Sequence, residues 1–430
     1  MRYACDPMPL PPLPRFDELD VDNRRVLVRV DFNVPLHAGP DGQQTVADDT
    51  RIQATLPTLR ELLRRNARLV LCSHLGRPDP KVGFDRALSM EPIGRRLAEL
   101  LELEVRLPDE VVGDGVTKLV NDTRAGQVVL LENLRFEAGE ERNDPEFARA
   151  LAKLCDVYVN DAFGASHRAH ASIVGVPEII HDHAPGLLMT RELEALSRIV
   201  DRLEHPFVAL VGGAKVSDKL GVLVALTERL VAGDAIAIGG AMANTFLLAR
   251  GASLGSSRVE RERLNDCKRV FDKAAARDVA VLLPVDLRCG GSLTDSVAQV
   301  IHVDEGVPEG RMALDIGAVT ERLFANTIAK AKTLFWNGPM GVFENPAFAS
   351  GTMAMAKAVA ECPGYTVVGG GDSVAALNMS GRADAVDHVS TGGGASLEFI
   401  EGRELPGVTA LAAWVDPTFR GTRPVEGDDA

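Results

Sequence analysis

Short apolar runs alternate with longer amphipathic stretches along most of the chain. The apolar runs are continuous and rich in Val, Ile and Leu, whereas stretches such as 51–66 and 217–231 have helical periodicity. Continuous apolar strands separated by helices are typical of parallel sheets that are covered on both faces. The predicted strands are 25–32, 68–73, 128–133, 157–161, 207–213, 235–240, 279–284, 333–338, 365–371 and 387–391. Their number is sufficient for two such sheets.

The length of 430 residues favours two domains, because a single core rarely grows that large. The stretch 187–206 has a helical pattern, has no strand signal and ends at a proline, so we expect the domain boundary there. The segment from residue 405 to the C-terminus is expected to be partly disordered. The predicted fold class is therefore α/β, with two doubly wound, Rossmann-like parallel-sheet domains.

Composition and charge narrow the class of protein. The chain is 46% hydrophobic and 25% charged, and its formal charge of −14 argues against nucleic-acid binding. It has neither an apolar leader nor an uninterrupted apolar span, so we predict no signal peptide and no membrane segment. The six cysteines are scattered without a Cys-x-x-Cys motif, which favours a reducing, cytoplasmic compartment.

Polar residues follow the predicted strands of the first half, where ligands bind in open α/β sheets. This half contributes four arginines, one histidine and several small polar residues: Asp31, Asn33, Arg51, His74, Arg77, Asn133, Arg135 and Arg168. Guanidinium groups in this number suit a small, highly charged anion that carries phosphate or carboxylate.

Glycine-rich turns follow the strands of the second half. They read GGAKVSDK (212–219), GGAMANT (239–245), WNGPMGVFE (336–344), GGGDS (369–373) and STGGGAS (390–396). Glycines at a strand-to-helix turn allow backbone N–H groups to approach a phosphate chain. Lys215 and Lys219 add positive charge, and Asp372 is a candidate Mg²⁺ ligand. The two halves together indicate a two-substrate phosphoryl-transfer enzyme.

Each of these patterns alone also has a purely structural interpretation. HLGRP (74–78) is compatible with a surface turn, the two lysines with a solvated helix face, and the glycine runs with tight turns. His167 and His170 lack a third metal ligand in pattern, and 181–183 is expected to be a solvated loop. The functional interpretation is favoured because the patterns all fall at predicted carboxyl ends of strands. The P-loop, protein-kinase and G-x-G-x-x-G motifs are absent from the sequence.

With these residues identified, the chain closely resembles the phosphoglycerate kinase family. Eight motifs occur in the order and approximate spacing of that family, and they span residues 29–398: RVDFNVPL, SHLGRP, LLENLRF, NDAFGASHRAHAS, GGAKVSDK, WNGPMGVFE, GGGDS and VSTGGGASLE. A match of this length is far more specific than any single glycine loop.

The resemblance implies reversible phosphoryl transfer between 1,3-bisphosphoglycerate with ADP and 3-phosphoglycerate with ATP, in glycolysis or gluconeogenesis, with Mg²⁺ as cofactor. It implies an N-terminal phosphoglycerate-binding domain (1–190, with 405–430 packing back on it) and a C-terminal nucleotide-binding domain (191–404), joined by a hinge helix. Family habit also suggests a cytoplasmic monomer without a nucleic-acid or membrane partner.

The resemblance also assigns roles to individual residues. Those implied to bind phosphoglycerate are Asp31, Asn33, Arg51, His74, Leu75, Gly76, Arg77, Arg135 and Arg168. Those implied to bind the nucleotide are Lys215, Lys219, Gly317, Asn337, Glu344, Gly370, Gly371, Asp372 and Ser373, with Glu344 at the ribose and Asp372 engaging Mg²⁺. Ser373 stands where the family usually has threonine, and Ser166 where alanine is more usual. The segment 37–49 is longer than the family minimum and lies just ahead of Arg51.

A mechanism follows as a hypothesis. The acceptor is an ionised carboxylate, so no general base is needed and catalysis rests on positioning and charge stabilisation. We expect Arg51 and Lys219, with the backbone amides around Gly393 and Gly394, to balance charge on the transferring group. Two alternatives remain at this point: a binding protein that has lost catalysis, and an acyl-phosphate kinase that acts on another small acid.

Overall fold

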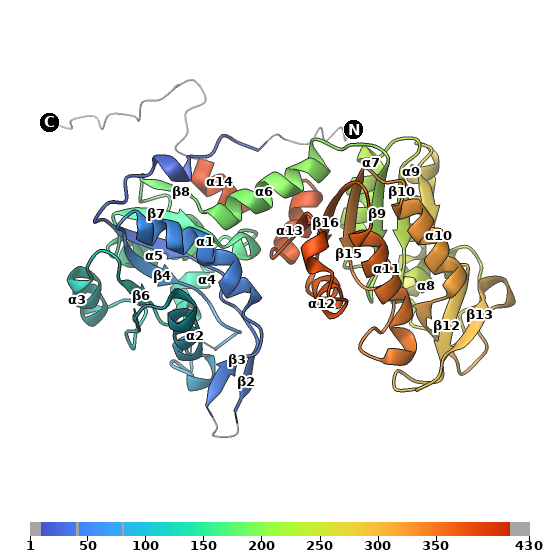
Figure 1. Cartoon of the computed structure of the whole chain (residues 1–430), viewed down its shortest axis with the longest axis horizontal. Coiled ribbons are helices and arrows are strands. Elements are labelled where there is room, and N and C mark those ends of the chain that lie inside the picture. The colour runs from blue at the N-terminus through green and yellow to red at the C-terminus, as the bar shows by residue number, and fades with distance from the viewer. Residues whose placement is uncertain (1–9, 40–42, 80, 413–430) are drawn as a thin grey trace. The chain divides into compact units, whose positions relative to one another are not determined.

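The structure, a computed structural model, describes residues 10–39, 43–79 and 81–412. By their internal contacts these residues divide into two units: 10–193 with 404–412, here called the N-terminal unit, and 194–403, the C-terminal unit. The expected boundaries at 190/191 and 404/405 lie within three residues of these divisions. Helix α6 (Leu187–Val200) spans the first division, so one continuous helix connects the two units (Figure 1).

The N-terminal unit contains a six-stranded parallel sheet in the order β5-β6-β4-β1-β7-β8. Its strands are β1 (Arg25–Arg29), β4 (Arg68–Cys72), β5 (Val105–Arg106), β6 (Val128–Leu130), β7 (Val157–Asn160) and β8 (His183–Pro185). Successive strand residues pack into different cores: Val26 and Val28 belong to one cluster and Leu27 to the other. The sheet is therefore covered on both faces, as the unbroken apolar runs predict.

Helices on each face supply the matching apolar surfaces. Helices α1 (Thr50–Arg64) and α2 (Glu91–Leu101) contribute to the first cluster. Helices α3 (Asp114–Asp122), α5 (Pro145–Ala152) and α14 (Pro406–Ala412) contribute to the second. Helix α14 is fixed by hydrogen bonds from the Gly407 amide to the Ser166 carbonyl and between His183 Nε2 and the Leu411 carbonyl. The chain thus returns to the N-terminal unit through α14, whereas the tail after residue 412 lies outside the described residues.

The C-terminal unit contains a second parallel sheet in the order β11-β10-β9-β15-β16-β17. Its strands are β9 (Phe207–Val211), β10 (Ala235–Ile238), β11 (Ala280–Leu282), β15 (Thr333–Asn337), β16 (Tyr365–Gly369) and β17 (His388–Val389). Helices α10 (Ala318–Ile328), α11 (Ser350–Ala360) and α12 (Gly371–Met379) bury their apolar residues in one core with this sheet. The remaining helices are α7 (Leu220–Arg229), α8 (Gly240–Ala249), α9 (Leu264–Ala275) and the short α13 (Gly394–Ile400).

All ten predicted strands are present, each one to three residues shorter than its apolar run. The sequence pattern missed the short strands β5 and β8 and two antiparallel elements. One is the hairpin of β2 (Leu36–Ala38) and β3 (Gln44–Val46), and the other is the sheet of β12 (Asp286–Gly290), β13 (Gln299–His302) and β14 (Met312–Ile316). These strands are short or carry polar residues, so they lack a continuous apolar signal.

Two local expectations were wrong. The segment 181–183 is a loop only at its first two residues, of which His181 is exposed, because His183 begins β8 and is 1% exposed. The helix expected over 187–206 ends at Val200. A proline disfavours the helical conformation of the residue that precedes it. Pro206 therefore keeps His205 out of the helix. None of the helices in the described part of the chain combines the length and apolar character needed to cross a bilayer.

Candidate active site

The carboxyl end of β1 carries a carboxylate that holds an arginine from α1. Asp31 is 8% exposed, and its Oδ2 accepts a hydrogen bond from Arg51 Nη1 at 3.0 Å. The same Nη1 donates to the backbone carbonyl of Asn33 at 3.3 Å. The side chain of Arg51 remains about one-third exposed, so it is oriented but still accessible to a ligand.

His74 lies beside this pair, at the carboxyl end of β4. Its Nδ1 is 3.9 Å from Asp31 Oδ1 and 3.2 Å from a terminal nitrogen of Arg29. Burial and the nearby charges of Arg29, Arg135 and Arg168 hold the pKa of His74 well below its usual range. A guanidinium can only donate, so Nδ1 is the acceptor and the ring proton resides on Nε2. His74 is therefore a neutral donor at neutral pH.

Arg29 is a residue of this site that the sequence analysis did not select. It is fully buried in β1, and its Nε donates to Ser172 Oγ at 2.8 Å. Ser172 in turn donates its hydroxyl to Glu140 at 2.6 Å, and its backbone N–H donates to the same carboxylate at 3.0 Å. The sequence does contain a signal for Arg29, which is a charged residue inside the apolar run VLVRVDF. A buried charge requires a partner, so its position indicates a polar site nearby.

Four neighbouring arginines and the neutral ring of His74 form what we call the cationic cluster: Arg29, His74, Arg77, Arg135 and Arg168. Arg135 is 7% exposed, and burial lowers its pKa, with further lowering by Arg168, Arg29 and Arg77; the charge of Glu141, 2.9 Å from Arg135 Nε, acts in the opposite direction. Arginines that lower one another's pKa lie close together, and among the described residues Arg135 alone of the four forms an ion pair with a carboxylate. The cluster is thus suited to a polyanionic ligand.

The turn after β4 is shaped by its neighbours. The Gly76 amide donates to Asn33 Oδ1 at 2.9 Å, and the Leu75 amide donates to Asn133 Oδ1 at 3.1 Å. Gly76 has φ +58°, which side-chain-bearing residues seldom adopt, and Arg135 donates to its carbonyl. Asn133 itself is fully buried: it accepts from the amides of Leu75 and Arg135 and donates to the carbonyls of Leu75 and Leu88, so its function here is structural. Arg77 is exposed.

In the C-terminal unit, the loop after β9 carries both selected lysines. Lys215 is exposed, whereas Lys219 is partly buried and its ammonium donates to Asn337 Oδ1 at the end of β15. Burial lowers the pKa of Lys219, and the charges of Asp218 and Asp372 oppose that effect. The loop between the lysines is fixed by Glu260, which accepts from the amides of Val216 and Ser217 and from the Ser217 hydroxyl at 2.7 Å. Sequence analysis gave no indication of Glu260, an ordinary surface-type residue in an irregular segment.

Gly317 and Glu344 lie at two further turns of this unit. Gly317 follows β14 and precedes α10, and an added Cβ would lie 2.2 Å from Asp286 Oδ2. Asp286 accepts hydrogen bonds from the amides of Val319 and Thr320 in the first turn of α10. This carboxylate fills the space next to Gly317, so only glycine fits at that position. Glu344 is exposed in the turn after β15.

Helix α12 begins in the turn GGGDS. Gly370 has φ +89°, and Gly371 and Asp372 are exposed at the first turn of the helix. Ser373, by contrast, is fully buried, and its hydroxyl accepts from the Gly338 amide, which connects the turns after β15 and β16. Gly393 has φ +51° and directly precedes α13, which begins at Gly394.

The structure thus groups the selected residues by unit. The residues selected for the anion lie at the carboxyl ends of the N-terminal sheet, and those selected for the nucleotide lie in the C-terminal unit. No cluster of three or more His, Cys, Asp or Glu side chains in the described residues could hold a metal ion. The exposed carboxylate of Asp372 fits Mg²⁺, which needs only one or two carboxylates when phosphate oxygens complete its shell.

Comparisons with known proteins agree on one family. The family model described as phosphoglycerate kinase matches residues 16–403. A phosphoglycerate kinase of Anaeromyxobacter sp. (strain Fw109-5) is 52% identical over 400 residues, which cover 93% of this chain and 99% of that protein. One of Thermomicrobium roseum is 51% identical over 394 residues, covering 92% and 98%.

Solved structures give the same result. The structure of phosphoglycerate kinase from Coxiella burnetii superposes with a TM-score of 0.82 at 39% identity, covering 94% of this chain and 99% of that one. That from Pyrococcus horikoshii gives a TM-score of 0.80 at 32% identity, covering 92% and 98%. The sequence motifs, the two parallel-sheet units and these matches over nearly the whole length lead to one conclusion: this chain belongs to the phosphoglycerate kinase family.

Proposed function

We propose that this protein catalyses the reversible transfer of a phosphoryl group between 1,3-bisphosphoglycerate with ADP and 3-phosphoglycerate with ATP. Membership of the family assigns this reaction and its place in glycolysis or gluconeogenesis. The observation that carries the assignment of the acid substrate is the cationic cluster next to the Asp31–Arg51 pair. A substrate with a phosphate and a carboxylate supplies the anionic charge that these guanidinium groups lack.

The residues have distinct proposed roles. Arg51, Arg77, Arg135 and Arg168 bind the acid, with the fully buried Arg29 adding positive charge, Asp31 keeping Arg51 oriented and neutral His74 donating from Nε2. Lys215, Lys219 and the turns at Gly317, Glu344, Gly370–Ser373 and Gly393–Gly394 bind the nucleotide. Asp372 holds Mg²⁺, which neutralises charge on the phosphate chain when it is bound. We further propose that the protein is a cytoplasmic monomer. The scattered cysteines support the compartment, and the usual state of the family supports the monomer.

Catalysis in this proposal needs no general base, since the acceptor is already a carboxylate. The chain instead orients the two reactants and stabilises the charge on the transferring group, with Arg51 and Lys219 as the cationic donors. Because the two ligands are assigned to different units, the units must bring them together and exclude water during transfer.

The test is turnover of the purified full-length chain with MgATP and 3-phosphoglycerate, with reduction of the product coupled to NADH oxidation. Arg51→Ala should lower kcat by about 10²–10³-fold, the usual effect of losing one charged donor to a transition state, with little change in ATP affinity. Arg60→Ala is the matched control, because Arg60 is an exposed arginine of the same helix that donates to the Leu100 carbonyl. An Arg51→Ala variant with near-normal kcat would remove Arg51 from this role.

One alternative is an acyl-phosphate kinase for a different small acid, which would share the nucleotide half. A panel of phosphorylated and unphosphorylated acids separates the two, since the cationic cluster should favour an acid that carries a phosphate. No turnover from folded protein that still binds ATP would favour the binding-protein alternative.

A further inference from the structure

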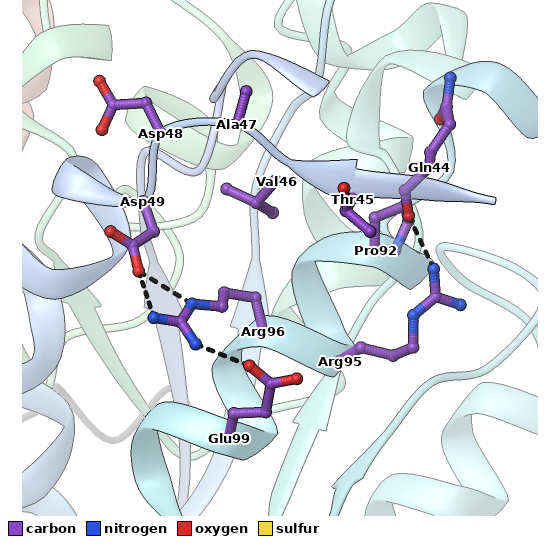
Figure 2. Close-up of a pocket in the computed structure, with 10 residues that line it drawn as sticks. All are labelled: Gln44, Thr45, Val46, Ala47, Asp48, Asp49, Pro92, Arg95, Arg96 and Glu99. Carbon is purple, nitrogen blue, oxygen red and sulfur yellow. Dashed lines mark hydrogen bonds and ion pairs between the residues drawn. The ribbon is translucent and has the colours of Figure 1, made fainter. Parts of the chain in front are cut away.

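A cavity of about 540 Å³ lies between the β2–β3 hairpin and helix α2 (Figure 2). It is lined by Gln44, Thr45, Val46, Ala47, Asp48, Asp49, Pro92, Arg95, Arg96 and Glu99. Both of its arginines are engaged by the protein itself: Arg95 pairs with Glu91, and Arg96 pairs with Asp49 and Glu99. Arg96 thereby links the two walls of the cavity, α2 and the segment before α1, so the cavity is better explained by what its walls hold in place.

Arg96 connects helix α2 to the segment that leads into α1. Its Nε and one terminal nitrogen reach Asp49 Oδ2 at 2.8 and 2.7 Å, and its other terminal nitrogen reaches Glu99 Oε2 at 2.6 Å (Figure 2). The Asp49 side chain is 20% exposed and the Arg96 side chain 37%. Glu99, one turn further along α2, thus braces Arg96 in the orientation that reaches Asp49.

Asp49 is the residue from which helix α1 starts, and Arg51 is the second residue of that helix. We call residues 47–49 the hairpin base. On one side the Ala47 amide donates to the Pro35 carbonyl at 2.9 Å, and on the other Arg96 holds Asp49. Asp48 then accepts from the Thr50 amide at 2.9 Å, immediately before Arg51. The direction in which α1 starts, and with it the origin of the Arg51 side chain, therefore depends on this base.

Arg51 needs that precision because its own contacts are few. Among the described residues, the Arg51 guanidinium donates only through Nη1, to Asp31 and to the Asn33 carbonyl, while the side chain remains partly exposed. A long side chain with one bonded terminal nitrogen follows any displacement of its backbone. A displacement of about 1 Å can lower the rate about 10²-fold when a side chain must stabilise the charge on the transferring group.

We propose that Arg96 is a positioning residue for Arg51: by holding Asp49 it sets the start of α1 and places the guanidinium of Arg51 for phosphoryl transfer. This inference rests on the proposed function, because it assigns Arg96 to the same reaction. The hairpin thereby acts as a support for the acid-binding residues, although it touches no substrate itself.

The experiment compares steady-state kinetics of Arg96→Gln, Arg96→Lys and Arg95→Gln in the full chain, each alone and with Arg51→Ala. Arg95 is the matched control, because it is the adjacent arginine of α2 and binds β3 at the Gln44 carbonyl, five positions before Asp49. We expect Arg96→Gln to lower kcat about tenfold with the KM for ATP unchanged. Arg96→Lys should recover part of this loss, and Arg95→Gln should change kcat by less than about twofold.

The cycle with Arg51→Ala separates positioning from general destabilisation. If Arg96 acts through Arg51, Arg96→Gln should cost less than about twofold more in kcat once Arg51 is already alanine. An equal loss in both backgrounds, or equal losses in Arg96→Gln and Arg95→Gln, would overturn the proposal. Asp49→Asn provides a second variant with the same expected kinetics should Arg96→Gln not fold. A wild-type protein without turnover would overturn the proposed function itself, whereas an active wild type with an unimpaired Arg96→Gln variant overturns only the role of Arg96.

Discussion

At the scale of residues, the N-terminal unit keeps two histidines neutral next to several arginines. Burial and the charges of Arg29, Arg135 and Arg168 lower the pKa of His74 well below its usual range and that of His170 to about 4. Glu140, 3.7 Å from His170 Nδ1, is itself bonded to Ser172. Neutral rings add hydrogen-bond donors to the cationic cluster without adding further repulsion between positive charges.

This arrangement predicts a pH dependence of stability. The folded pKa of His170 is depressed, so between its unfolded value of 6.5 and about 4 the unfolded chain binds a proton that the folded chain does not. The free energy of unfolding should therefore fall as pH is lowered through this window, by up to about 1.4 kcal/mol per pH unit for one group. In thermal unfolding from pH 7 to 4.5, His170→Asn should flatten the fall of the midpoint.

The control for this measurement is His302→Asn, because the His302 side chain is 47% exposed and lies in the other unit. That variant should retain the slope of the wild type. Identical slopes for wild type and His170→Asn would show that His170 is not kept neutral by folding.

Sequence reasoning located the polar residues that follow strands but not the residues that support them. Asp31, His74 and Arg135 stand at the ends of apolar runs, where the pattern itself draws attention to them. Arg29 stands inside such a run, and its hydrogen bond to Ser172 joins residues 143 positions apart. A local pattern contains no information about contacts of that range.

At the scale of elements, the loop between β9 and α7 depends on a residue outside it. Glu260 accepts three hydrogen bonds from Val216 and Ser217, which lie between Lys215 and Lys219. Burial alone would raise the pKa of Glu260, but the bonds from Ser217 and Val216 outweigh it and the net shift is downward, as expected for a carboxylate that receives hydrogen bonds.

Glu260→Gln should consequently loosen this loop and weaken nucleotide binding. Hydrogen bonds to a charged group contribute about 1.5–3 kcal/mol, so the KM for ATP should rise about tenfold or more, with a smaller change in the KM for 3-phosphoglycerate. Glu262→Gln is the matched control, since Glu262 is exposed two residues away and the change in charge is the same. Titration of MgADP by calorimetry checks the effect independently of turnover, and unchanged affinity in Glu260→Gln would contradict it.

At the scale of the whole molecule, the chain consists of two α/β units connected through α6, with α14 returning to the first. The residues assigned to the acid and to the nucleotide lie in different units. In the proposed reaction the units must bring the two ligands together, and we expect full closure only when both are bound. We therefore predict that 3-phosphoglycerate with MgADP, which cannot react, lowers the radius of gyration more than either ligand alone. Small-angle scattering measures this directly, and the same radius in all four ligand states would count against closure.

The sequence by itself determined the ten strands with continuous apolar runs, the presence of two parallel sheets and the polar residues at their carboxyl ends, because hydrophobic periodicity and glycine-rich turns are local signals. It also carried the family motifs. Only the tertiary structure decided which residues support these groups. Arg29 contacts His74, Glu260 binds the Val216 amide and Arg96 binds Asp49, and the members of these pairs are 45, 44 and 47 residues apart. Such pairs exist only once helices and strands have packed, because the packing of whole elements brings distant side chains within hydrogen-bond distance.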